Sequence, residues 1–278
     1  MGLLKSLGSE FIYGGHFTAL TIVLFPVSIS ILIGAQLSWD WVIPVYLGCY
    51  GAYLFNRFKE LKIDIKTNPK RSKYLMKRKK DFLFRIILSV TLLLAIPLIS
   101  RDFLTFSFFL LLVILSLLYS VCLKGLTRKI PCFKNIYLAF VCSLLSFYPF
   151  IRYQKPFGVS DIFLLSFVFS RVFSNSSFCD IKDLENDRSQ GLLTLPSLVG
   201  IKGTRIILSI VSISLLFIIV ICTLVHTFPI IFLTLCPVLV YSLFYQNVSV
   251  KDETKIILWS ESESFILFLT VFCSSQFL

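Results

Sequence analysis

Long apolar stretches recur along the whole chain, and they constrain its fold more than any other feature. Hydrophobic residues make up 56% of the 278 residues, whereas Asp, Glu, Lys and Arg together make up only 15%. In soluble globular domains about a quarter of all residues are charged, so this composition excludes an ordinary soluble protein. A helix satisfies its backbone hydrogen bonds internally and crosses a bilayer with about 20 mostly apolar residues. The sequence therefore predicts an all-α, polytopic membrane protein.

Nine stretches are candidates for membrane-spanning helices, and we expect them to form a single domain over residues 1–278. They are Phe17–Leu37, Val42–Phe55, Phe84–Ile99, Phe103–Leu123, Asn135–Ile151, Ile162–Cys179, Ile206–Thr227, Phe228–Tyr245 and Ile256–Leu278. The second stretch is short in apolar length, so its helix should continue as a polar helix beyond the membrane. The ninth contains Glu261 and Glu263 in its first half, which interrupts its apolar character.

Basic residues are distributed unevenly among the loops. Most of the 27 Lys and Arg lie in the connections that follow the second, fourth, sixth and eighth stretches, and the opposite connections carry only Arg101, Arg152 and Lys155. Cytoplasmic loops of membrane proteins are enriched in Lys and Arg. We therefore expect the basic side to face the cytoplasm, where its charge would attract anionic lipid headgroups. Because these residues lie close to membrane helices, we expect no nucleic acid partner.

Two groups of oxygen-bearing side chains follow predicted spans on this basic side. They are the first acidic segment, Asn56, Glu60 and Asp64, and the second acidic segment, Asp180, Asp183 and Asp187. At 100° per residue of α-helix, the members of the first group fall within about 80° of one another, and those of the second within about 60°. Carboxylates this close beside a bilayer repel each other unless a cation joins them, and Mg²⁺ favours hard oxygen ligands. The alternative for each segment alone is a solvated, polar helix end.

A third segment, residues 119–135, lies between the two acidic segments and is rich in basic residues. The Tyr119 hydroxyl and the Lys124 ammonium lie five positions apart, and together they could bind phosphate oxygens. The alternative is an interfacial tyrosine beside a lysine that extends to the membrane surface. The eight cysteines form no C-x-x-C pair, which argues against a zinc or iron–sulfur site.

Taken together, these three segments resemble the UbiA superfamily of intramembrane prenyltransferases. The family pattern is N-D-x-x-D-x-x-x-D after the second helix and D-x-x-x-D after the sixth, with Tyr-Ser-x-x-Leu-Lys after the fourth. This chain has N-R-x-x-E-x-x-x-D from residue 56, D-x-x-D-x-x-x-D from residue 180 and the Tyr-Ser-x-x-Leu-Lys sequence from residue 119. The stretch from Asp180 to Gly200 is the most specific match. Arg57 and Glu60 depart from the pattern.

The resemblance implies a nine-helix bundle with a central cavity and Mg²⁺-dependent transfer of a prenyl group from an allylic isoprenyl diphosphate. The acceptor would be a lipid-soluble molecule, aromatic or otherwise. The residues implied to be catalytic and to bind metal are Asn56, Glu60, Asp64, Asp183 and Asp187, with Asp180 as a further metal ligand. The residues implied to neutralise the departing diphosphate are Tyr119, Lys124, Arg71 and Arg128.

Two alternatives remain open at the level of sequence. The altered first acidic segment leaves the acceptor class undetermined, so a UbiA-type terpene cyclase that needs no acceptor is the main alternative. The other is a transporter or lipid-binding membrane protein whose acids coordinate ions. Transporters usually place ionisable groups near the middle of the membrane, whereas these acids lie at one face.

Overall fold

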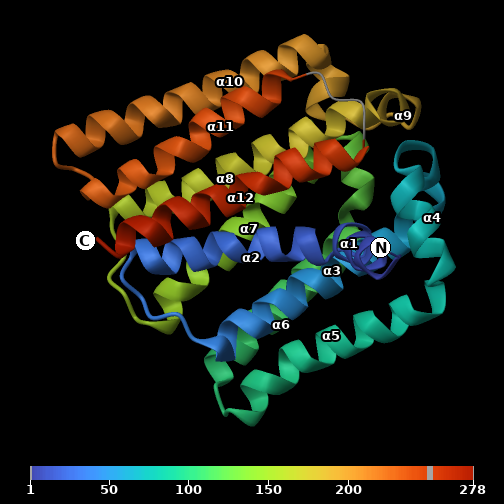
Figure 1. The fold of residues 1–278 in the computed structure, drawn as a ribbon, viewed down its shortest axis with the longest axis horizontal. Helices are drawn as coiled ribbons and strands as arrows, with labels where there is room; N and C mark the ends of the chain where they lie inside the picture. Colours follow the sequence, from blue (N-terminus) through green and yellow to red (C-terminus); the bar gives the residue numbers. More distant parts are fainter. Residues whose placement is uncertain (1, 249–252, 278) are drawn as a thin grey trace. The chain divides into compact units, whose positions relative to one another are not determined.

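The computed structural model describes residues 2–248 and 253–277. The predicted all-α class is confirmed, since 86% of the residues are helical and the described part contains no strand (Figure 1). Its α-helices are α1 (Gly2–Tyr13), α2 (His16–Leu32), α3 (Trp39–Thr67), α4 (Pro69–Lys77), α5 (Lys79–Ile99), α6 (Phe103–Val121), α7 (Phe133–Arg152), α8 (Val159–Asp180), α9 (Leu184–Ser189), α10 (Leu195–Leu224), α11 (Cys236–Asn247) and α12 (Glu253–Ser275). Its 3₁₀ turns are η1 (Leu123–Arg128), η2 (Ile181–Asp183) and η3 (Ile230–Leu235).

The membrane character is confirmed, although the count of nine spans is only approximate. Within the described residues, seven helices are long and apolar enough to cross a membrane, and an eighth span results if α1 and α2, which are bent by 58°, count together. The remaining predicted span, Val42–Phe55, lies inside α3, which continues to Thr67 as the sequence predicted. The protein is therefore a multi-pass integral membrane protein whose third helix extends beyond its apolar part.

The chain divides into two compact units. Unit 1 contains Met1–Val23 and Ser38–Cys122, and unit 2 contains Leu24–Leu37 and Leu123–Leu278. In unit 1, α3 packs against α4, α5 and α6. Its core is formed by residues such as Leu54. The single domain expected over residues 1–278 stays a prediction.

A polar cluster around Glu10 ties α1 into unit 1. The Glu10 carboxylate accepts hydrogen bonds from Tyr74 and Arg78 and from Arg85, whose Nη1 lies 2.5 Å from Glu10 Oε1. His16 Nε2 lies 3.6 Å from the same oxygen. Because these partners come from α2, α4, α5 and the residue that joins α4 to α5, one carboxylate holds four parts of the unit together.

Unit 2 is built on α7 and α8, with α10, α11 and α12 packed around them. Buried side chains from several helices form its core, among them Phe178, Leu208 and Tyr245. Gly200 interrupts α10 with φ 73° and ψ 175°, a backbone conformation that is essentially restricted to glycine. This break separates a short first turn of α10 from its long apolar part.

A buried ion pair lies inside unit 2 and explains how the ninth predicted span accommodates an acid. Arg171 Nε donates to Glu263 Oε1 at 2.5 Å, and the Tyr245 hydroxyl donates to Glu263 Oε2 at 2.5 Å. Arg171 Nη1 also donates to Ser212 Oγ at 3.0 Å. Arg171 and Glu263 are both almost fully buried. A charge in an apolar bundle is tolerated when it is paired in this way, so the network fixes α8 against α10, α11 and α12.

Candidate active site

The spacing of Asp180, Asp183 and Asp187 predicted that they share one face of a single α-helix. This prediction is wrong, because the helix is not continuous. α8 ends at Asp180, residues Ile181–Asp183 form the 3₁₀ turn η2, and α9 begins only at Leu184. A 3₁₀ turn advances by about 120° per residue instead of 100°, so the angles calculated for an α-helix no longer apply. Asp180, Asp183 and Asp187 are instead presented by a compact bend after the span.

Asp180 is held by two side chains from the start of α7. Lys134 Nζ lies 2.7 Å from Asp180 Oδ1, and Asn135 Nδ2 donates to Asp180 Oδ2 at 2.9 Å. The Asp180 carboxylate is 2% exposed, so these contacts replace the water it has lost. Neither Lys134 nor Asn135 was a predicted site residue. No local periodicity could have linked them to Asp180, because the pairing depends entirely on the packing of α7 against α8.

Asp187 is also buried, and the loop that follows α9 stabilises it. Thr194 Oγ1 donates to Asp187 Oδ2 at 3.1 Å, and the Leu192 amide donates to the Asp187 carbonyl at 2.9 Å. Gly191 makes this loop possible, because its φ of 68° lies in the left-handed region. Asp180 and Asp183 add negative charge around the Asp187 carboxylate, and Lys134 adds positive charge. Glu185, on the exposed side of α9, stays in contact with solvent.

Backbone hydrogen bonds join the third segment to Leu193, in the loop that follows the second acidic segment. The Leu193 amide donates to the Thr127 carbonyl at 3.0 Å, and the Cys132 amide donates to the Leu193 carbonyl at 2.7 Å. Burial, and to a smaller extent the charge of Asp180, raises the pKa of the Cys132 thiol. Lys124 and Arg128 belong to η1, where Lys124 is half-buried and Arg128 is exposed. Unit 2 therefore brings residues 123–135, the part of the third segment that it contains, beside the second acidic segment.

The first acidic segment lies on the polar part of α3 in unit 1. Asn56 Nδ2 donates to Glu60 Oε2 at 3.3 Å, and Arg57 Nη1 lies 3.4 Å from the same oxygen. The Arg57 guanidinium also lies over the Tyr53 ring, 5.4 Å from its centroid. Asp64 belongs to α3, but its side chain lies outside the described residues.

Unit 1 also brings α3 to the end of α6. Lys59 Nζ donates to the Ser120 carbonyl at 3.2 Å, so the helix of the first acidic segment contacts the residue that follows Tyr119. Lys59 was not among the predicted site residues, and its sequence position gives no sign of this contact. Arg71 lies on α4, which packs against α3, and is 6% exposed.

The two acidic segments differ in how well they suit a magnesium ion. No three His, Cys, Asp or Glu side chains among the described residues form a ready metal cluster. Mg²⁺, however, is commonly held by one or two carboxylates, with waters and substrate phosphates completing its shell. Asp187, with Asp180 and Asp183 nearby, offers carboxylates of this kind, and Lys182 Nζ lies 3.8 Å from Asp183 Oδ2. In the first acidic segment, Arg57 and Asn56 both contact Glu60 Oε2, so a dication bound there would lie close to the positive charge of the guanidinium.

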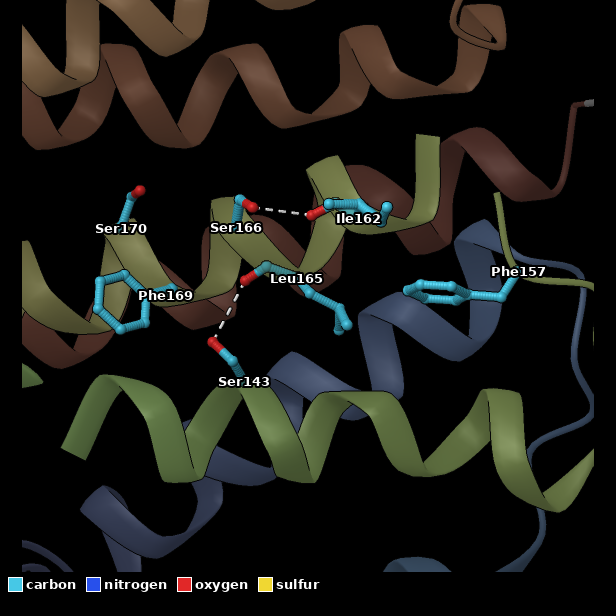
Figure 2. Close-up of a pocket in the computed structure, with 7 residues that line it drawn as sticks. All are labelled: Ser143, Phe157, Ile162, Leu165, Ser166, Phe169 and Ser170. Carbon is cyan, nitrogen blue, oxygen red and sulfur yellow. Dashed lines mark hydrogen bonds between the residues drawn. The ribbon is translucent and has the colours of Figure 1, made fainter. Parts of the chain in front are cut away.

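An apolar pocket of about 320 Å³ lies in unit 2 between α7 and α8 (Figure 2). It is lined by Ser143, Phe157, Ile162, Leu165, Ser166, Phe169 and Ser170. Ser143 and Ser166 donate to the carbonyls of Leu165 and Ile162, so their hydroxyls are already engaged with backbone. Ile162 and Asp180 lie about 27 Å apart along α8, so this pocket contains none of the predicted site residues.

Comparison with known proteins identifies the family. The family model for the UbiA prenyltransferase family matches residues 14–269. The chain belongs to this family. The resemblance that the three segments suggested is thereby confirmed, and a comparison with curated proteins found no match.

Solved structures confirm the UbiA fold. An apo UbiA homolog from Aeropyrum pernix K1 is similar with a TM-score of 0.68 and 14% identity, over 91% of this chain and 97% of the other. A UbiA homolog from Archaeoglobus fulgidus bound to DMAPP and Mg²⁺ has a TM-score of 0.64 and 15% identity, over 97% of this chain and 99% of the other. A structure of digeranylgeranylglyceryl phosphate synthase has a TM-score of 0.60 and 14% identity, over the full length of both chains. At these identities the similarity establishes the fold alone.

Proposed function

We propose that this UbiA family member transfers a prenyl group from an allylic isoprenyl diphosphate to a lipid-soluble acceptor within the membrane. Family membership supports prenyl transfer in general. The observation that carries the proposal furthest is the pair of buried carboxylates, Asp180 and Asp187, each held by side chains or loops from elsewhere in unit 2. Burying two acids together is costly unless a ligand or cation makes use of their charge.

The second acidic segment is proposed to bind magnesium and the diphosphate. Asp183 and Asp187 are the proposed magnesium ligands, with Asp180 as a further ligand that Lys134 and Asn135 hold in place. When bound, magnesium would supply positive charge for the leaving diphosphate. The homolog bound to DMAPP and Mg²⁺ supports this choice of substrate class and ion.

The remaining site residues are proposed to stabilise charge as the reaction proceeds. Breaking the C–O bond heterolytically leaves an allylic carbocation and places the electron pair on the diphosphate oxygen. Basic and hydroxyl groups that bind this oxygen more tightly as its charge grows accelerate the step. The residues proposed for this role are Tyr119, Lys124, Arg71 and Arg128. The first acidic segment, Asn56, Glu60 and Asp64, is proposed to act on the same diphosphate.

The acceptor then attacks the carbocation and loses a proton. Water would react with the cation in the same way, so the surrounding helices must exclude it. The basic loops suggest that this chemistry takes place at the cytoplasmic side of the membrane.

A terpene cyclase is the second candidate, and the departure of the first acidic segment from the family pattern favours keeping it. In a cyclase, a double bond of the same isoprenoid attacks the carbocation, and no acceptor is consumed. The departures, Arg57 and Glu60, lie in the segment proposed to bind the diphosphate. They give no indication that the enzyme uses an acceptor.

Product analysis separates these candidates. Membranes that contain the protein are incubated with Mg²⁺ and allylic diphosphates of several lengths, with and without candidate acceptors, and the products are identified by mass. We expect acceptor-dependent coupling with release of diphosphate. A cyclic hydrocarbon or alcohol formed without an acceptor would support the cyclase instead. If no diphosphate is turned over under any condition, the enzymatic proposal is wrong.

A further inference from the structure

Arg57 places a permanent positive charge inside the first acidic segment. Its Nη1 lies 3.4 Å from Glu60 Oε2, and Asn56 Nδ2 donates to the same oxygen at 3.3 Å. Two donors therefore share one oxygen of the Glu60 carboxylate, Oε2. Because the guanidinium and the carboxylate sum to zero, this pair offers no excess negative charge to a dication.

The surroundings of Arg57 hold its guanidinium in a defined position. Glu60 contacts it from one turn further along α3, and the Tyr53 ring lies beneath it, 5.4 Å away, from one turn before. The Arg57 side chain is 23% exposed, so it is ordered by neighbours while it still reaches the surface of the helix. A guanidinium presents its donors in a planar fork that matches phosphate oxygens in a bidentate manner.

We propose that Arg57 takes the place of a metal ion in the first acidic segment. Its guanidinium binds the diphosphate directly, and Glu60 is a positioning residue that orients this guanidinium. Magnesium is then required only at the second acidic segment. This inference rests on the proposed function and narrows it, because it fixes how each segment neutralises the diphosphate.

Counting bound metal tests the inference without reference to turnover. The full-length protein is purified in detergent and titrated with Mn²⁺ in the presence of inorganic pyrophosphate. Electron paramagnetic resonance distinguishes an isolated Mn²⁺ ion from a magnetically coupled pair. We expect an isolated ion that Asp187→Asn removes and Glu60→Gln leaves in place. A coupled pair that Glu60→Gln reduces to an isolated ion would overturn the inference.

Substitutions at Arg57 provide a second test. Arg57→Asp restores an acid at this position, and we expect it to create a second Mn²⁺ site. Arg57→Gln should weaken pyrophosphate binding by about 10- to 100-fold without changing the metal count, since it removes a charge-assisted contact. Arg57→Lys should recover part of this loss because it keeps the charge but not the planar fork. Unchanged pyrophosphate affinity in Arg57→Gln, measured by calorimetry, would overturn the inference.

A matched control and one further outcome separate this inference from the proposed function. Lys77 is an exposed cation on α4, and Lys77→Gln should change pyrophosphate affinity by no more than about twofold. Absence of any pyrophosphate-dependent Mn²⁺ binding in the unmodified protein would contradict the proposed function, and the inference with it. Two coupled ions would contradict the inference alone.

Discussion

In the first acidic segment, Glu60 finds its charge partner one turn away on its own helix, whereas in the second, Asp180 finds its partners on a different helix. Glu60 contacts Arg57 and Asn56 within α3. Asp180 contacts Lys134 and Asn135, which lie 46 and 45 residues earlier in the chain. The difference matters because a contact within one helix forms whenever that helix forms, whereas Asp180 is neutralised only when α7 packs against α8.

The two segments also differ in what they leave for a ligand. In the first, Glu60 is balanced by Arg57, an arginine one turn earlier on the same helix. In the second, the three carboxylates of Asp180, Asp183 and Asp187 outnumber the two lysines beside them, Lys134 and Lys182. As proposed, the first segment presents a cation to a diphosphate, whereas the second holds a metal ion.

The strongest test of this contrast is Asp187→Asn. Because it removes a proposed metal ligand, we expect turnover of allylic diphosphate to fall by about 1000-fold or more. The measurement is initial rate in detergent, together with a folding check by circular dichroism. Glu185→Gln is the matched control, since this exposed acid lies two positions earlier on α9. Normal turnover in Asp187→Asn would remove Asp187 from the mechanism.

Breaking the buried Arg171–Glu263 ion pair tests whether the helices of unit 2 depend on contacts between residues that are far apart in the sequence. Glu263→Gln leaves the buried Arg171 charge uncompensated, and we expect the free energy of unfolding to fall by about 3 kcal/mol. Denaturation of the detergent-solubilised protein provides the measurement. Glu261→Gln is the control, because Glu261 is less buried and is not part of the Arg171 pair. Equal stability of the two variants would show that the pair is dispensable.

Lys134→Met sharpens the comparison at the site itself. It removes the lysine that faces the buried Asp180, so we expect a loss of stability of about 1–2 kcal/mol, smaller than that for Glu263 because Lys134 is partly exposed. Turnover should fall as well, since the Asp180 carboxylate would lose a contact that holds it in place. The control is Lys129→Met, at an exposed position before α7. A variant as stable and active as the control would contradict the role assigned to Lys134.

The smallest expected effect concerns the backbone that follows the second acidic segment. Gly200→Ala should lower the free energy of unfolding by about 1–2 kcal/mol, because alanine is strained at this positive φ. Added bulk is not the cause, since open space surrounds the position of a new Cβ. Gly8→Ala is the control, since Gly8 also has open space but lies in a helix. A Gly200→Ala variant that is no less stable than Gly8→Ala would argue against strain at the break.

Several features of the site followed from the chain alone. The nine apolar stretches predicted the helices, and the short second stretch predicted that α3 would continue through the first acidic segment. Both depend on local properties, namely apolar length and the spacing of polar residues along a helix. The resemblance of the three segments also identified the family, since the residues that carry it are read in order along the chain.

The sequence by itself determined the all-helical class, its membrane character and the family, because each depends on residues that are near neighbours in the chain. Only the tertiary structure decided that Asp180 is held by Lys134 and Asn135, that Glu263 is balanced by Arg171 and that α8 gives way to a 3₁₀ turn before Asp187. The physical reason is that a buried charge is compensated by the groups that helix packing brings within hydrogen-bond distance. These groups can be far apart in the sequence.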